Sequence, residues 1–156
     1  MESALIETSV ISYFGAPESK HPATAARQSL TKLWWDKDRF RYDCYISTYV
    51  LAEITQGNPE KADKRLESVR GWPILTDNDL IGILAAKYLQ AISIPEESKI
   101  DAFHLAAATV HRMEYLVSWN LKHLVNPQIQ RILDAINLRE GYRSPILCTP
   151  ELLMED

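Results

Sequence analysis

Three carboxylates and one amide occupy positions from which they could hold a divalent cation, although they lie far apart along the chain. They are Glu7, Glu53, Asp101 and Asn120. Carboxylates brought close together repel one another unless a cation neutralises them, and oxygen ligands of this kind suit Mg²⁺ or Mn²⁺. Such an ion can activate water for attack on a phosphodiester and stabilise charge on the phosphoryl oxygens. The set therefore predicts a nuclease.

A further polar residue, Ser118, follows an apolar run in the stretch YLVSWNLKHLVNP, residues 115–127. Glu7 likewise follows a short apolar run near the start of the chain. Loops just beyond strand ends are where α/β proteins place many binding and catalytic side chains. We therefore expect the candidate residues to converge at one edge of a sheet.

The elements that must position these residues alternate between strands and helices. Short apolar runs predict strands, and longer stretches with helical apolar spacing, bounded by Asn, Pro or Gly, predict helices. Strands are expected at 3–7, 42–47, 73–75, 115–119 and 145–148, and helices at 8–14, 22–38, 48–57, 58–71, 78–92, 96–113 and 126–141. The alternation predicts an α/β fold, with a central, mainly parallel sheet of four to five short strands flanked by helices on both faces.

Hydroxyl residues are expected to cap two of the helices that carry or adjoin the candidate site. Thr8 or Ser9 would cap the helix at 8–14, and Thr48 would cap the helix at 48–57, because a side-chain oxygen can accept a hydrogen bond from a free backbone N–H of the first turn. Asp101 is expected in the first turn or two of the helix at 96–113.

Each candidate ligand also has an ordinary structural explanation. Glu7 could be a surface carboxylate at a strand end, and Glu53 could belong to a structural ion pair, because a charge among apolar neighbours is costly. Asp101 could favour a helix N-terminus through the helix dipole, and Asn120 could be a helix cap. Only the four together indicate a site.

Other arrangements of reactive residues are weaker. His104 and His111 share a helix face at a spacing of seven residues, but no third ligand is spaced with them, so both are expected to be packing or surface residues. A triad of Ser47, His104 and Asp101 lacks the G-x-S-x-G turn that would present the serine. The five glycines are scattered singly, which argues against a phosphate-binding loop.

The composition is typical of a globular protein. The chain has 156 residues, of which 46% are apolar and 24% charged, and we expect one domain spanning residues 1–156. The formal net charge is −4, so the chain lacks the overall basic character common among nucleic-acid-binding proteins. Contact with a nucleic acid would need a local basic strip.

The two cysteines and the apolar runs suggest where the protein resides. Cys44 and Cys148 lie far apart in apolar runs, and we expect buried thiols in a reducing compartment. No apolar run approaches the ~20 residues of a membrane span, and the N-terminal stretch lacks the basic region of a signal peptide. We therefore expect a cytoplasmic protein that does not bind membranes.

Four short motifs in this order resemble the PIN-domain family, in particular the VapC-like toxins of bacterial toxin–antitoxin pairs. They are LIETSVISY, STYVLAEI, DAFHLAAA and YLVSWN, and the segments LKHLVNP and GYRSPILCTPELL also look like one branch of that family. The resemblance covers nearly the whole chain. It implies a single PIN-like domain with Mg²⁺- or Mn²⁺-dependent endoribonuclease activity on RNA, inhibition by a cognate antitoxin protein, and homodimers.

The resemblance also assigns roles to individual residues. Glu7, Glu53, Asp101 and Asn120 match the metal-binding and catalytic positions, Ser118 matches a supporting hydroxyl, and Ser9 is a second candidate for that support. The chain departs from the family pattern at three of these positions. Glu7 replaces the commoner Asp, which moves the carboxylate outward by ~1.5 Å, Asn120 replaces Asp, and Ser118 replaces Thr. We therefore expect one well-held metal ion.

Two other functions remain open. One is a catalytically weak PIN-like module that binds RNA or a partner protein, which the neutral Asn120 and the long Glu7 side chain would favour. The other is an unrelated α/β enzyme that acts on a small phosphate ester. A loss of RNA cleavage on replacing Glu53 would separate a nuclease from a binding module.

Residues outside the acidic set are expected to contact RNA or the antitoxin. Phosphate contacts are expected from Lys122 and His123, with Arg39 or Arg41 as further candidates. An apolar groove is expected for the antitoxin, walled by the region around Trp34 and Trp35 or by the helix at 59–70. One of these tryptophans is expected in the core.

Overall fold

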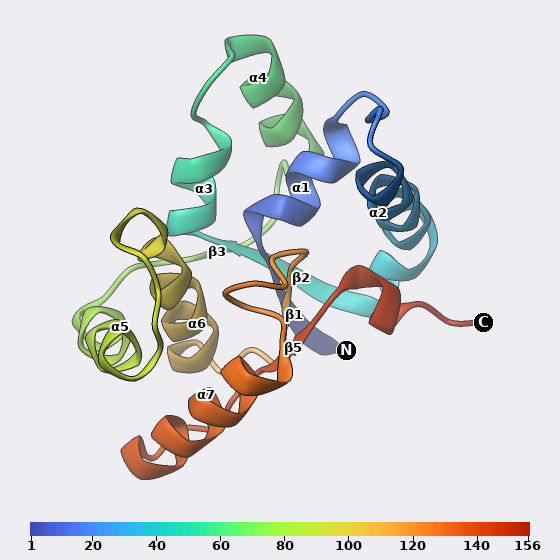
Figure 1. Ribbon diagram of the computed structural model, residues 1–156. Coiled ribbons are helices and arrows are strands. Elements are labelled where there is room, and N and C mark those ends of the chain that lie inside the picture. The colour runs from blue at the N-terminus through green and yellow to red at the C-terminus, as the bar shows by residue number, and fades with distance from the viewer.

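Five parallel strands form one sheet between two layers of helices in the computed structural model, which describes residues 1–156 (Figure 1). The strand order is β3-β2-β1-β4-β5. The strands are β1 (Glu2–Ile6), β2 (Tyr42–Ser47), β3 (Ile74–Leu75), β4 (Tyr115–Val117) and β5 (Ile146–Cys148). The predicted α/β fold with a parallel sheet and helices on both faces is confirmed.

Strand β1 lies at the centre of the sheet, and its register aligns the carboxyl ends of its neighbours. Leu5 is opposite Tyr45 of β2 on one side and Leu116 of β4 on the other. Ile6 is opposite Val117, the last residue of β4. The residues that follow β1 and β4 therefore emerge side by side, as the sequence predicts for Glu7 and Ser118.

Seven α-helices cover the two faces of the sheet. They are α1 (Thr8–Gly15), α2 (Pro22–Leu33), α3 (Thr48–Ile54), α4 (Pro59–Ser68), α5 (Asp79–Ala91), α6 (Ile100–Val110) and α7 (Pro127–Glu140). Successive strand residues point to opposite faces. Leu5 and Leu116 accordingly pack into a core with α5, α6 and α7, whereas Ile6 and Val117 pack into a second core with α1 and α3.

Two of the predicted helices differ from the structure. The helix predicted at 22–38 is α-helical only to Leu33 and continues as a π-helix, Trp34–Asp38, and a 3-10 turn, Arg39–Arg41. The wider π turn allows two successive residues, Trp34 and Trp35, to face the core, where they are 0% and 4% exposed. The helix predicted at 96–113 instead begins with a separate 3-10 turn, Glu96–Ser98, before α6.

The predicted caps of α1 and α3 are wrong, because they lie one or two residues after the observed caps. Glu7 caps α1 by accepting a hydrogen bond from the backbone N–H of Ser9, and Ser47 caps α3 by accepting one from Val50. At the other end of a helix, Gly141 adopts a φ of 82° after α7, a left-handed conformation that glycine tolerates best. The end of this helix predicted from the sequence is confirmed.

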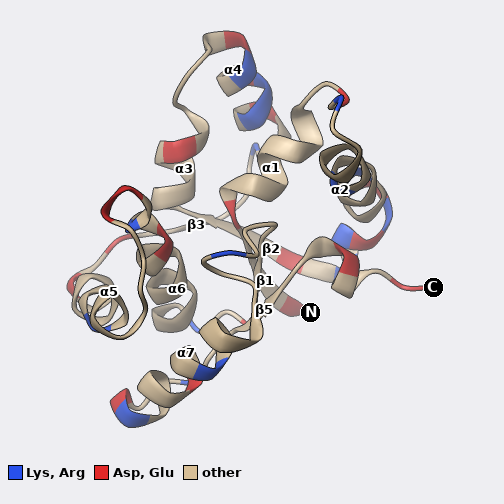
Figure 2. Ribbon diagram, in the orientation of Figure 1, with Lys and Arg blue, Asp and Glu red and all other residues tan.

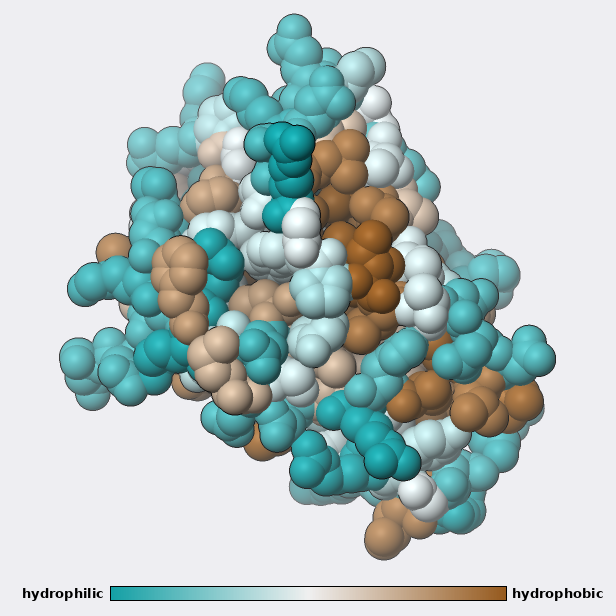
Figure 3. Space-filling view, turned by 180° about the vertical axis from the view of Figure 1, so that it is seen from behind, coloured by the Kyte–Doolittle hydropathy of each residue, from teal (hydrophilic) through white to brown (hydrophobic).

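Other features of the core and the surface are the two cysteines, the composition of the helices and the distribution of hydrophobic side chains. Cys44 and Cys148 are buried and unpaired, and burial raises the pKa of each thiol to about 12, which agrees with the expectation of inert buried thiols. None of the helices combines the length and apolar composition needed to cross a membrane. From behind, hydrophobic side chains gather in a band near the middle of a mainly hydrophilic surface (Figure 3).

Candidate metal centre

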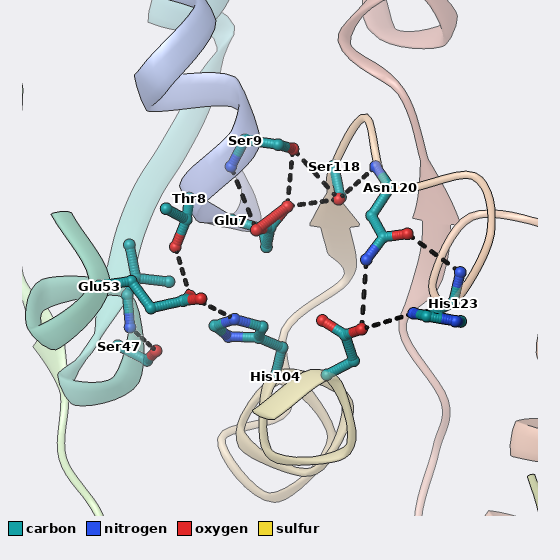
Figure 4. A network of polar contacts seen from close by, with 11 residues as sticks. Glu7, Thr8, Ser9, Ser47, Glu53, His104, Ser118, Asn120 and His123 are labelled. Carbon is teal, nitrogen blue, oxygen red and sulfur yellow. Dashed lines mark hydrogen bonds and ion pairs between the residues drawn. The ribbon is translucent and has the colours of Figure 1, made fainter. Parts of the chain in front are cut away.

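The candidate side chains meet at the carboxyl edge of the sheet, although they come from four separate parts of the chain (Figure 4). Glu7 directly follows β1, Ser118 directly follows β4, Glu53 lies near the end of α3, and Asp101 lies in the first turn of α6. Hydrogen bonds and short distances connect all of them, as described below. The predicted convergence is therefore present.

Glu7 is held by three hydrogen bonds in a buried position, where it is 6% exposed. Its Oε1 accepts from the hydroxyl of Ser118 at 2.5 Å and from that of Ser9 at 2.7 Å, and its Oε2 accepts from the backbone N–H of Ser9 at 3.1 Å. A carboxylate offers about four acceptor sites. Glu7 therefore keeps about one acceptor site that an ion could use, and both serines contact it as the sequence-based expectation requires.

Glu53 reaches the site from α3 and is fixed through one oxygen. Its Oε1 accepts from the hydroxyl of Thr8 at 2.6 Å and lies 2.7 Å from Nε2 of His104. Burial pushes the pKa of Glu53 upward, but the hydrogen bond and charge of His104, aided by Thr8, outweigh burial and lower it below its usual value. The carboxylate is thus ionised at neutral pH, with Oε2 free of hydrogen bonds.

Asp101 is oriented by two neighbours from the loop after β4. Its Oδ2 accepts from Nδ2 of Asn120 at 3.3 Å and from Nδ1 of His123 at 3.1 Å. Burial raises the pKa of Asp101; the neighbouring His104 and His123 oppose this, and the charge of Glu7 reinforces it. Because both partners bind Oδ2, Oδ1 is left free. Asn120 also accepts from the backbone N–H of His123 at 3.0 Å, but this bond closes a turn and no helix begins there, so the alternative of a helix cap is wrong.

His104 is the member of the site that the sequence-based analysis missed. It is 0% exposed, as expected for a packing residue, but its Nε2 and one oxygen each of Glu7 and Glu53 all lie within 4.8 Å of one another. Burial alone would lower the pKa of His104, whereas the Glu53 hydrogen bond and the charges of Glu7, Glu53 and Asp101 raise it above its usual value. Its spacing of three residues from Asp101 places both on one helix face, which was the available signal.

The buried environment of His104 indicates a donor to Glu53 rather than a metal ligand. Its Nδ1 is buried and has no hydrogen-bond partner. A histidine that ligates a metal through one nitrogen usually donates its other N–H to a carbonyl or carboxylate. Ligation through Nε2 would lack such a partner and would also replace the contact of Nε2 with Oε1 of Glu53 at 2.7 Å.

The donor set otherwise fits a divalent cation. Oε2 of Glu53 and Oδ1 of Asp101 accept no hydrogen bond, because the contacts of these carboxylates use their other oxygens. Mg²⁺ is usually bound by one or two carboxylates and keeps several waters. Glu53 and Asp101 therefore each keep one oxygen that could bind an ion, whereas most of Glu7 is already committed to hydroxyl and amide donors. The atoms that lie within 4.8 Å of one another belong to Glu7, Glu53 and His104 and do not include Asp101.

Only some of the residues expected to contact RNA phosphates or to line an antitoxin groove lie near the site. Arg39 and Arg41 precede β2 and so lie at the opposite edge of the sheet from the carboxylates; the expectation that they serve the site is wrong. Trp34 and Trp35 are buried and cannot wall an open groove. Lys122 is exposed in the loop after β4, at the edge of the sheet that carries the site.

Solved structures of two toxin systems share this fold. VapC20 of Mycobacterium tuberculosis, a toxin that cleaves the sarcin-ricin loop, superposes with a TM-score of 0.56 at 18% identity over 73% of this chain and 87% of its own. VapBC2 from Rickettsia felis, bound to a DNA fragment from its promoter, superposes with a TM-score of 0.51 at 15% identity over 94% of this chain and 97% of that one. The sequence matches no protein-family model and no curated protein.

These likenesses concern the course of the backbone. They agree with the order of strands and helices described above, and the PIN-like α/β fold expected from the sequence is confirmed. At identities of 18% and 15% they carry no residue roles from one protein to another.

Proposed function

We propose that this protein is a metal-dependent endoribonuclease, the toxin component of a toxin–antitoxin pair, and that it hydrolyses RNA phosphodiesters with a carboxylate-bound Mg²⁺ or Mn²⁺ ion. The observation that carries the proposal is the meeting of Glu7, Glu53 and Asp101, from three separate elements, at the carboxyl edge of a parallel sheet. The fold shared with toxins supports it.

Each residue has a definite task in this proposal. Glu53 and Asp101 offer their free oxygens to the ion, and Glu7 contributes its remaining acceptor site. The other polar residues hold these carboxylates in place, namely Ser9, Ser118, Asn120, His104 and His123. When bound, the ion would activate water and stabilise negative charge on the phosphoryl group.

The proposal also includes protein partners. A cognate antitoxin is supported by the shared fold with toxins, including VapBC2. A homodimer is supported by Leu80 and Ile83, two exposed apolar side chains that lie three residues apart and so share one face of α5, because clustered apolar side chains often mark protein contacts. A cytoplasmic location is part of the proposal, because the proposed RNA substrate and antitoxin would be encountered there.

Replacing Glu53 with glutamine tests the proposed chemistry. Glu53→Gln keeps the shape of the side chain but removes its charge, so RNA cleavage with Mn²⁺ should fall about a hundredfold or more. The measurement is the initial rate on a labelled single-stranded RNA, with circular dichroism to verify folding. Glu151→Gln, an exposed carboxylate far along the chain, is the matched control and should cleave at the wild-type rate.

The same experiment separates a nuclease from a binding module. Glu7 already accepts three hydrogen bonds and Asn120 is neutral, which are the features that favour a weak or inactive site. Equal cleavage by wild type and a folded Glu53→Gln variant, or none by either, would refute the proposed nuclease.

A further inference from the structure

A polar cleft of about 220 Å³ lies between the end of α1 and the start of α4. Its polar lining comes mainly from Ser12, Asn58, Glu60, Lys61, Lys64 and Arg65. Lysine and arginine are prominent on α4, which stands beside α1, while acidic residues mark α3 and the start of α1 (Figure 2). The cleft is therefore a local basic feature in a chain whose net charge is −4.

The positive charge in this cleft is not neutralised by ion pairs with nearby carboxylates. Lys61 and Lys64 are exposed, and neither belongs to any ion pair of the structure. Arg65 donates to the backbone carbonyls of Ile54 at 2.9 Å and Gln56 at 2.7 Å, so its charge also stays uncompensated. Glu60 is the only carboxylate in the lining, and a net positive cleft results.

Two connections along the backbone link the cleft to the carboxylate site, although none of the site's carboxylates lines it. Thr8 donates to Glu53 at 2.6 Å, and Ser12, one turn further along the same face of α1, lines the cleft. The two residues are four positions apart, about 6 Å along the helix axis. Arg65 holds the backbone at Ile54, the residue immediately after Glu53. A ligand that spans the two places needs anionic groups spaced along an extended chain.

We propose that this cleft binds an RNA phosphate next to the phosphodiester that lies at the carboxylate site. The inference rests on the proposed function, since it takes RNA as the ligand of the neighbouring site. The polar, basic lining suits phosphate oxygens, because lysine, arginine, serine and asparagine side chains commonly bind them in complexes with nucleic acids. An apolar helix of a partner protein would require a hydrophobic groove instead.

The test measures RNA binding without cleavage. The variant Lys61→Gln with Lys64→Gln removes two charges, and binding of a labelled single-stranded RNA is followed by fluorescence anisotropy in EDTA between about 50 and 200 mM salt. We expect at least about fivefold weaker binding at the lowest salt. The slope of log affinity against log salt should become shallower by about 0.7, because one lost phosphate contact with a single strand changes it by about that much.

A charge-matched control lies on the opposite side of the molecule. Arg131→Gln with Arg139→Gln removes two charges from exposed positions of α7, which is far from α4 (Figure 1). This control should bind RNA with wild-type affinity and slope. Equal losses in the two double variants would indicate an effect of net charge alone and would overturn the proposal.

The outcome is distinguishable from failure of the proposed function. If the double variant of Lys61 and Lys64 bound RNA with the wild-type affinity and salt dependence, the proposed phosphate site in the cleft would be overturned. This holds even if the wild-type protein cleaves RNA with Mn²⁺. Conversely, a wild-type protein that binds RNA through these lysines but cleaves none would support the cleft and refute the nuclease.

Discussion

The buried imidazole of His104 joins three carboxylates into one electrostatic unit. Its Nε2 lies 2.7 Å from Oε1 of Glu53, and the charges of Glu7 and Asp101 add to that of Glu53 in raising its pKa. In a protein without bound metal, a proton on His104 compensates part of the negative charge that an ion would otherwise neutralise. Removing that proton leaves the carboxylates to repel one another.

This arrangement predicts how stability without metal depends on pH. The pKa of His104 is raised above its ordinary value of 6.5, so its protonation stabilises the folded state fully below that value, and the stabilisation is lost as pH rises through the folded pKa. The free energy of unfolding in EDTA should therefore fall as the pH rises above the ordinary histidine pKa of about 6.5. Urea unfolding at several pH values measures it.

Two variants control this pH experiment. His104→Gln should show a weaker decrease over the same range, because the group that loses its proton is gone. His111→Gln changes a histidine of the same region whose Nε2 contacts only the backbone carbonyl of Thr76, and it should retain the wild-type decrease. A wild-type free energy of unfolding in EDTA that does not fall as the pH rises above about 6.5 would contradict the account.

At the scale of the element, the start of α3 determines where Glu53 lies. The helix is short, Thr48–Ile54, and follows directly from β2. Ser47 is fully buried and accepts the hydrogen bond from Val50 at 3.1 Å. Thr48, the cap predicted from the sequence, instead has a buried hydroxyl without any hydrogen-bond partner.

Substitutions at these adjacent positions should have unequal effects. Ser47→Ala removes the cap and should lower the free energy of unfolding by about 1 kcal/mol. Thr48→Val keeps the side-chain volume and removes a hydroxyl that makes no bond, so stability should be unchanged or slightly raised. Denaturant unfolding of both variants measures the difference, and a larger loss in Thr48→Val would show that the cap is misassigned.

Most elements could be predicted from the sequence because their boundaries have local causes. Apolar runs mark the strands, and residues such as Asn126 before α7 and Gly141 after it act within one helical turn. The π-helix at Trp34–Asp38 could not be predicted, because it depends on how both tryptophans pack against residues from distant elements. The caps of α1 and α3 were placed too late because several polar residues follow one another there, and Glu7 caps α1 although Ser and Thr are the commoner cap residues.

At the scale of the whole molecule, the sheet order brings the site together. Because β1 lies between β2 and β4, the residues after all three strands share one edge. This could be predicted for Glu7 and Ser118, which directly follow apolar runs. The role of His104 could not, because its contact with Glu53 joins residues that are 51 positions apart. The cleft beside α4 likewise arises from the packing of α1 against α4.

The most direct test of the central claim is calorimetric titration of Mn²⁺ into the wild-type protein and into Asp101→Asn, with circular dichroism to verify folding. The Oδ1 atom of Asp101 accepts no hydrogen bond. Exchange for the isosteric amide therefore affects only the contacts of Oδ2 with Asn120 and His123. We expect binding by the wild type and at least about tenfold weaker binding by the variant. Asp134→Asn, an exposed position of α7, should bind like the wild type. Equal affinity of the wild type and a folded Asp101→Asn, or no Mn²⁺ binding by the wild type even with a short RNA present, would contradict the carboxylate site as a metal centre.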